Sequence, residues 1–274
     1  MPQSPALLSP LAHDRKGAGE TVVLIHGIGH RRQAWDPVFD LLAERYDVIR
    51  LDLAGFGESP AYPARTPYNM DNACADLTAN FAQWGVEKPH VVGNSLGGAI
   101  ALELAVRGLV SSATVLSPAG FFGRLERLWP LLMLSLMRLA SLLPDRALRM
   151  VSRSPIGRHL VGLLLYANPG RATAEATYGD SVALKRGSGF FPTIRAGLSY
   201  ELDATGLDVP TTVAWGTRDR LLRYRQAGEA RRRLPTAVHV PLPECGHVPM
   251  IDDPALIVEV IDQTVARAGA AEAA

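Results

Sequence analysis

The chain has 274 residues, a formal net charge of +1 and 47% hydrophobic residues. This length suits one large domain, with or without an insertion, and is enough to bury a core without disulfides or a structural metal. The hydrophobic content excludes a disordered chain, and the nearly neutral charge gives no general attraction to nucleic acid. The two cysteines provide neither a disulfide framework nor a zinc-ligand spacing, so we expect no metal and no cofactor.

The amino-terminal segment MPQSPALLSPLAHDRKG contains no basic region followed by an apolar one, so we predict no secretory signal. The longest nearly apolar run, residues 128–137, is far shorter than the ~20 residues that a membrane-spanning helix requires. We therefore expect a cytoplasmic protein without a membrane span.

Short runs rich in β-branched apolar residues alternate with amphipathic segments in the first part of the chain. The runs predict buried strands over residues 21–25, 47–51, 90–93 and 113–117. Helices are expected over residues 35–45, from a capping Asn69 to about Trp84, and over residues 96–107. This alternation is typical of right-handed βαβ units with a parallel sheet.

The alternation stops at about Pro118 and returns after Leu202. The residues between them form long apolar helical segments, punctuated by prolines, with no convincing strand. Strands are predicted again over 211–215 and 237–242, helices over 223–234 and 255–267, and the last residues are expected to fray. The pattern predicts a doubly wound α/β domain with a mostly parallel sheet, formed by residues 1–117 and 203–274, and a helical insertion over residues 118–202.

Residues 93–98, Gly-Asn-Ser-Leu-Gly-Gly, place the pattern G-x-S-x-G directly between a predicted strand and a predicted helix. Small residues on either side of Ser95 allow the tight turn that raises its hydroxyl above the sheet. The backbone N–H of Leu96 then lies at the amino end of a helix, where negative charge is favoured. These features predict that Ser95 is a nucleophile, the alternative being a chance match in a loop.

A serine nucleophile needs a general base and an acid that orients the base. Of the seven histidines, His247 alone lies in a loop after the last predicted strand, at the sheet edge where sites of open α/β sheets form. Asp219 follows the preceding strand, which gives the chain order Ser, Asp, His. We predict that Ser95, Asp219 and His247 form a triad; the alternatives are a turn histidine and a solvated aspartate paired with a neighbouring arginine.

The turn His26-Gly27-Ile28-Gly29 ends the first predicted strand. Its glycines allow the backbone to approach a substrate closely. We expect the Ile28 N–H to face the Leu96 N–H across the nucleophile and complete an oxyanion hole, the alternative being a plain tight turn. The next residues, 30–32, are expected to start a solvent-exposed helix, with binding of an anionic substrate group as the alternative.

Five segments occur in the order and with the spacing that they have in the α/β-hydrolase superfamily: LIHGIG, LDLAGFGES, GNSLGG, WGTRD and ECGHVPMIDDP. The sequence resembles this superfamily across nearly its whole length. The resemblance implies the α/β-hydrolase fold, makes residues 118–202 a cap over the active site, and gives the catalytic roles to Ser95, Asp219 and His247 and the oxyanion amides to Ile28 and Leu96. One departure is that only about 20 residues precede the first predicted strand, which leaves room for one earlier strand but little for two.

We expect a serine hydrolase that cleaves an ester of a small or medium-sized apolar carboxylic acid through an acyl-enzyme. Asn94 before the nucleophile is similar to the carbon–carbon bond hydrolases of aromatic ring-cleavage pathways, which usually carry Trp after the catalytic His, where this chain has Val248. That activity is the main alternative; perhydrolysis, acyl transfer and thioester cleavage are others. Ser95 argues against the aspartate-dependent dehalogenases and epoxide hydrolases. A ligand receptor without chemistry would show an eroded triad, and none of the motif is eroded here.

The insertion has two further features. Its leucine-rich segment, residues 128–143, predicts a helix apolar on most sides, which we expect to pack the cap onto the core; a passage for an acyl chain is the alternative. Residues 121–165 contain seven Arg and two acids, typical of a solvated basic face, while attraction to an anionic membrane would make the protein an interfacial lipase. The expected partner is a small apolar ester; peripheral membrane contact through the cap and the oligomeric state stay open.

Overall fold

The computed structural model describes residues 7–123 and 126–272. A seven-stranded sheet runs through the protein in the order β1-β3-β2-β4-β5-β6-β7. Its strands are β1 (His13–Lys16), β2 (Thr21–Ile25), β3 (Asp47–Leu51), β4 (His90–Asn94), β5 (Ser112–Leu116), β6 (Thr211–Gly216) and β7 (Val238–Leu242). Every neighbouring pair is parallel except β1 with β3. The prediction of a mostly parallel sheet with room for one earlier strand is confirmed.

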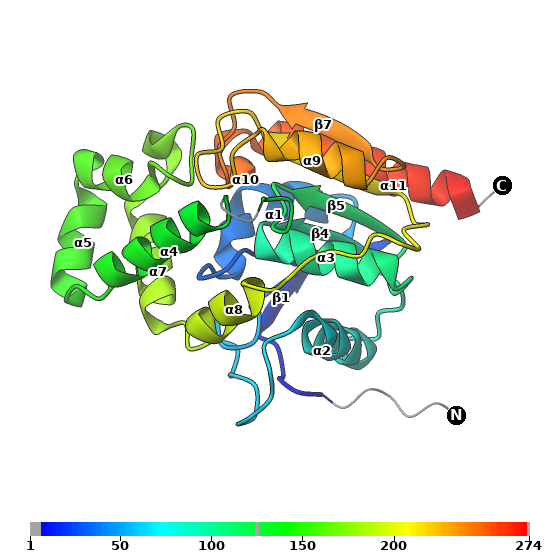
Figure 1. Cartoon of the computed structure of the whole chain (residues 1–274), viewed down its shortest axis with the longest axis horizontal. Helices are drawn as coiled ribbons and strands as arrows, with labels where there is room; N and C mark the ends of the chain where they lie inside the picture. Colours follow the sequence, from blue (N-terminus) through cyan, green and yellow to red (C-terminus); the bar gives the residue numbers. More distant parts are fainter. Residues whose placement is uncertain (1–6, 124–125, 273–274) are drawn as a thin grey trace.

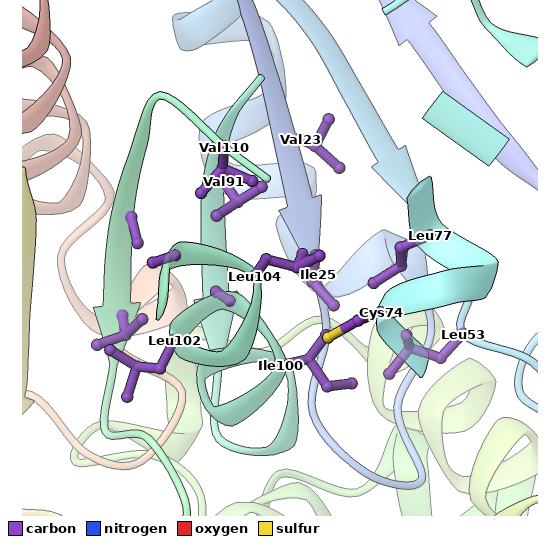
Figure 2. Packing of buried hydrophobic residues seen from close by; sticks show 14 of the residues in the cluster. Val23, Ile25, Leu53, Cys74, Leu77, Val91, Ile100, Leu102, Leu104 and Val110 are labelled. Atoms are coloured by element: carbon purple, nitrogen blue, oxygen red, sulfur yellow. The ribbon is translucent and has the colours of Figure 1, made fainter. Parts of the chain in front are cut away.

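The central strands are buried on both faces because helices cover the two sides of the sheet. Successive strand residues point to opposite faces, so Val23 and Ile25 join one apolar cluster while Val22 and Leu24 join the other. Helices α2 (Met70–Gln83), α3 (Leu96–Val106) and α9 (Gln226–Arg233) contribute to the first cluster, and α1 (Asp36–Ala43) and α11 (Pro254–Glu272) to the second. Figure 2 shows part of the first cluster, to which β2 contributes Ile25, α2 contributes Cys74 and α3 contributes Ile100.

The ends of the core helices follow local signals with two exceptions. Helix α2 begins after Asn69, whose side chain accepts a hydrogen bond from the Asn72 N–H at 2.9 Å, as the sequence predicted. The helix expected from residue 35 is preceded by a 3₁₀ turn, η1 (Arg32–Trp35). Helix α11 continues to Glu272, so the residues up to that point do not fray as expected, and residues 273–274 lie outside the described part of the chain.

Between β5 and β6 the chain forms helices without a strand among described residues 118–123 and 126–202, and we call residues 118–202 the cap. Its elements are α4 (Leu128–Ser141), α5 (Asp145–Arg153), α6 (Pro155–Gly162), η2 (Pro169–Arg171), α7 (Ala174–Arg186) and α8 (Phe190–Gly197). Helices α4 to α7 lie to one side of the sheet, whereas α8 lies near the core helices α2 and α3 (Figure 1). The short helix α10 (Pro249–Asp252) follows the last strand.

Helix α4 does not pack as the sequence predicted. Leu128, Leu132, Leu136 and Leu139 are between 50% and 64% exposed, and their spacing places them along one side of the helix. The interpretation that this apolar helix mainly packs the cap onto the core is therefore wrong for its outer side. In the described part of the chain, no single helix is long and apolar enough to cross a membrane; α4 and α5 meet such a test only together, across a bend of 109°.

Candidate active site

Ser95 lies on the sharp turn between β4 and α3. Its backbone has φ 57° and ψ −113°, a strained conformation for a residue with a side chain. The turn requires its glycines, since a Cβ on Gly93 would lie 2.1 Å from the Gly97 carbonyl oxygen, and one on Gly97 would lie 2.2 Å from the Ile25 carbonyl oxygen. The Ser95 N–H donates to the Leu116 carbonyl at 3.0 Å, which ties the turn to β5. The surrounding contacts therefore hold a strained serine at the carboxyl edge of the sheet.

His247 and Asp219 form a buried pair beside this turn. The distance from His247 Nδ1 to Asp219 Oδ2 is 2.8 Å, and the two side chains are 4% and 0% exposed. The other carboxylate oxygen accepts from the backbone N–H groups of Leu221 at 2.9 Å and Leu222 at 2.8 Å, which fixes the carboxylate. Because a carboxylate can only accept a hydrogen bond, His247 Nδ1 carries the proton in this bond. The lone pair of Nε2 is then free to take up a proton, as a general base requires.

Two residues that the sequence analysis did not assign to the site hold the His247 loop in place. The Asn94 amide donates to the carbonyls of His247 at 2.8 Å and Leu116 at 3.0 Å, so it links the nucleophile turn directly to the histidine loop. Asp252 accepts from the Gly246 N–H at 2.8 Å and also from backbone N–H groups of the cap. Asp252 belongs to the segment GHVPMIDDP, but the cap residue that it binds lies 84 residues away in the sequence. No local sequence pattern therefore indicates this contact.

The predicted site residues converge at two adjoining pockets. Ser95, His247 and Ile28 line a pocket of about 70 Å³, closed from the cap side by α4, α6 and α7. Ser95, Ile28 and Leu96 line a second pocket of about 90 Å³, whose surface is almost entirely apolar. Asp219 lies behind His247 and contacts neither pocket. A Cβ on Gly27 would lie 3.2 Å from the Ser95 Cβ, so the glycine turn passes directly against Ser95.

His26 holds this glycine turn in place. The ring is fully buried, its Nδ1–H donates to the Gly27 carbonyl at 2.7 Å, and its Nε2 accepts from the Leu53 N–H at 3.0 Å. Both bonds are satisfied only by the neutral ring, and burial lowers the pKa of His26 to about 4, although Asp52 nearby acts in the opposite direction.

The three residues after the turn differ from the prediction of a solvent-exposed helix start. Arg32 is buried and forms an ion pair with Asp52, and Arg31 Nε lies 2.9 Å from Asp180 Oδ1 of α7. These guanidinium groups are already neutralised, which removes the support for the alternative of binding an anionic substrate group. The ring nitrogens of His30 are buried without a hydrogen-bond partner among the described residues, and the carboxylate of Asp180 lies 3.8 Å from Nε2.

Comparison with known proteins agrees with this geometry. Residues 22–260 match the model of the alpha/beta hydrolase family. The chain is 29% identical to a pimeloyl-[acyl-carrier protein] methyl ester esterase of Chromobacterium violaceum, with 86% of this chain and 90% of that protein covered. It is 28% identical to a 2-hydroxy-6-oxo-6-(2'-aminophenyl)hexa-2,4-dienoic acid hydrolase of Metapseudomonas resinovorans, covering 87% and 81% of the two chains.

A crystal structure of a membrane phospholipase A superposes with a TM-score of 0.74 at 26% identity, covering 95% of this chain and 83% of that one. The family match covers most of the chain, and the strand order, the nucleophile turn and the Asp219–His247 pair agree with it. The chain belongs to the α/β-hydrolase family and is a hydrolase.

Proposed function

We propose that the protein is a serine esterase that hydrolyses esters of small or medium-sized apolar carboxylic acids through an acyl-enzyme. The observation that carries this proposal is the buried Asp219–His247 pair, whose imidazole lines the same pocket as a serine on a strained turn. A serine, a histidine and a carboxylate that orients the histidine are the groups that nucleophilic acyl transfer requires.

In this mechanism the Ser95 hydroxyl attacks the acyl carbonyl while His247 Nε2 takes its proton. The backbone N–H groups of Ile28 and Leu96 stabilise the oxyanion of the tetrahedral intermediate, and each such donor is worth roughly 10²–10³ in rate. His247 then gives the proton to the leaving alcohol, which departs and leaves the acyl group on Ser95. Water, deprotonated by the same His247, attacks this acyl-enzyme and releases the carboxylic acid and the free serine.

The surroundings of Ser95 support an apolar ester as substrate. The pocket shared by Ser95 and Leu96 is closed by apolar side chains, among them Leu131, Leu134 and Leu222. Such a lining favours a hydrocarbon group, and Arg127 is the one charged residue among the described residues that line this pocket. The name of the Chromobacterium relative, a methyl ester esterase, supports an ester rather than another acyl substrate.

Hydrolysis of p-nitrophenyl esters from acetate to palmitate, by the wild type and by Ser95→Ala, tests this proposal. We expect activity in the wild type and a loss on the order of 10⁶ in kcat for the variant, with an unchanged circular dichroism spectrum. An unchanged kcat in Ser95→Ala would refute the mechanism. If a folded wild type hydrolyses none of these esters, the esterase proposal fails and carbon–carbon bond hydrolysis becomes the leading candidate.

The outer side of the cap favours a second candidate, a lipase that acts at an anionic membrane surface. The exposed leucines of α4 form one apolar side, and α5 presents Arg146, Arg149 and Arg153 on adjacent turns. Apolar side chains beside arginines are the combination that binds anionic lipid interfaces. Co-sedimentation with vesicles of anionic and of neutral lipid tests it: retention on anionic vesicles that high salt abolishes supports this candidate, and equal recovery in the supernatant with both vesicles excludes it.

A further inference from the structure

The cap contains an apolar cavity that the catalytic steps above do not use. It lies among α4, α5, α6 and α7 and has a volume of about 400 Å³, several times that of the catalytic pocket. Its lining is apolar apart from two serines, and it includes Met133, Leu136, Ala140, Leu148, Val151 and Leu160. The two serine hydroxyls donate to carbonyls of their own helices, at 2.7 Å and 2.8 Å, so they are already satisfied. The cavity therefore suits a hydrocarbon and offers no group that would select a polar ligand.

This cavity adjoins the catalytic pocket. Met137 of α4, Val161 of α6, and Ser181 and Leu184 of α7 line both spaces. These four side chains form the boundary between the cavity and the pocket that holds Ser95 and His247. The catalytic pocket alone is too small to enclose a chain of about twelve carbons, whereas the cap cavity on the other side of these four side chains has the volume for one.

The cavity also reaches the outer surface of the cap. Leu136, Leu143 and Leu160 line it and are 50%, 47% and 66% exposed. Leucines that line a cavity and remain exposed at its rim lower the cost of moving a hydrocarbon chain from a lipid aggregate into the protein, since the chain leaves one apolar surface for another. A route made of apolar side chains thus runs from the surface of the cap toward the nucleophile.

We propose that the cap cavity is the binding site for the acyl chain of a medium-chain ester such as a dodecanoate, whose carbonyl lies at Ser95 while its chain passes between Met137 and Leu184 into the cap. The proposal rests on the esterase function and specifies its substrate class. It predicts that chain-length preference is decided by the cavity among α4 to α7, outside the catalytic pocket.

A bulky side chain introduced into the cap cavity tests this proposal. Ala140 lines the cavity and is exposed at its rim, so the variant Ala140→Trp adds bulk there without forcing a large residue into a closed core. Leu139→Trp is the matched control, because Leu139 is the adjacent residue of α4, is 64% exposed and lies outside the cavity lining. The measurement is kcat/KM for p-nitrophenyl butyrate and p-nitrophenyl laurate, both below the concentration at which laurate esters form micelles.

We expect Ala140→Trp to lower the laurate-to-butyrate ratio of kcat/KM at least tenfold, and Leu139→Trp to leave the ratio within twofold of the wild type. Equal ratios in Ala140→Trp and the wild type would overturn the proposal. Failure of the esterase function itself is a different result, because the wild type would then hydrolyse neither ester.

Binding of free dodecanoate gives a readout that needs no turnover. In the Ser95→Ala background, dodecanoate is expected to raise the melting temperature far more than butyrate does, because only the longer chain reaches the cap cavity. Adding Ala140→Trp should remove this difference and adding Leu139→Trp should preserve it. A dodecanoate effect that survives Ala140→Trp would place the chain elsewhere and reject the cap cavity.

Discussion

The core and the cap both contain helices rich in apolar residues, but they use them differently. Helix α3 of the core buries eight of its eleven residues against the sheet, whereas α4 of the cap buries two of its fourteen. Close packing makes the core stiff, since few of its atoms can move without loss of contacts. The cap keeps apolar surface uncovered, which is free to contact a substrate or a lipid.

This difference is consistent with the separate tasks that we propose for the two regions. The strained Ser95 turn persists because glycines on both sides pack directly against neighbouring backbone, and Asp219 is fixed by two backbone N–H groups. Such geometry must be held to fractions of an ångström for acyl transfer. The cap contacts the same pocket through Met137 and Leu184, side chains with several rotamers, and these suit recognition of a flexible chain better than catalysis.

The largest expected effect of a single change lies in the triad that we propose for the core. Asp219→Asn should lower kcat on p-nitrophenyl butyrate by about 10⁴, because the amide would favour the wrong tautomer of His247 while keeping its position. The control is Asp180→Asn in α7, a carboxylate near the same pocket that is outside the triad and should cost less than tenfold. Similar losses in both variants would show that the division between core catalysis and cap recognition is wrong.

Glycine-to-alanine substitutions test the difference in packing between core and cap through the free energy of unfolding. Gly97→Ala in α3 should lower the free energy of unfolding by about 4 kcal/mol or more, because its Cβ would lie 2.2 Å from a backbone oxygen that cannot move freely. Gly197→Ala in α8 places its Cβ in open space, where nothing lies within 4 Å, and should raise stability by about 0.5–1 kcal/mol through helix propensity. Urea denaturation of the two variants measures both, and equal destabilisation would contradict the packing described.

The sequence predicted the core better than the cap. The core strands and the Ser95 turn were predicted correctly because their signals are local: a β-branched run buried on both faces, then glycines where a Cβ cannot fit. The packing of the outer side of α4 was predicted wrongly, because a helix that is apolar on all sides has the same sequence pattern whether its outer side is covered or exposed. Arg31 was assigned to a solvent-exposed helix start because its partner, Asp180, lies 149 residues away on another element.

Acid titration tests the lowered pKa of the buried core histidine His26. The folded-state pKa of His26, about 4, lies below its ordinary value near 6.5. Between these two pH values His26 is therefore mostly protonated in the unfolded chain and mostly neutral in the folded protein. His26 therefore destabilises the fold progressively as pH falls from about 6.5 to 4, on the order of 2 to 3 kcal/mol in total. Above about pH 7.5 it contributes no pH dependence, because the ring is then neutral in both states.

His26→Gln is expected to reduce this acid sensitivity, measured as the slope of unfolding free energy against pH between 6.5 and 4. His159→Gln, at an exposed position of α6, is the control for the His-to-Gln substitution itself. Asp76, whose pKa burial raises to about 6, contributes the opposite slope as pH falls, but it is present in all three proteins and cancels in the comparison. An identical slope in wild type and His26→Gln would mean that folding does not lower the pKa of His26.

The smallest expected effect is on the outer side of the cap. Leu139→Gln should change the free energy of unfolding by less than about 0.5 kcal/mol, because the side chain is 64% exposed and glutamine is also a good helix former. The matched core change, Leu102→Gln in α3, buries an amide without a partner and should cost several kcal/mol. If Leu139→Gln also costs more than about 1.5 kcal/mol, another surface covers these leucines in solution. A melting temperature that rises with protein concentration in the wild type but not in Leu139→Gln would then identify that surface as a second copy of the chain.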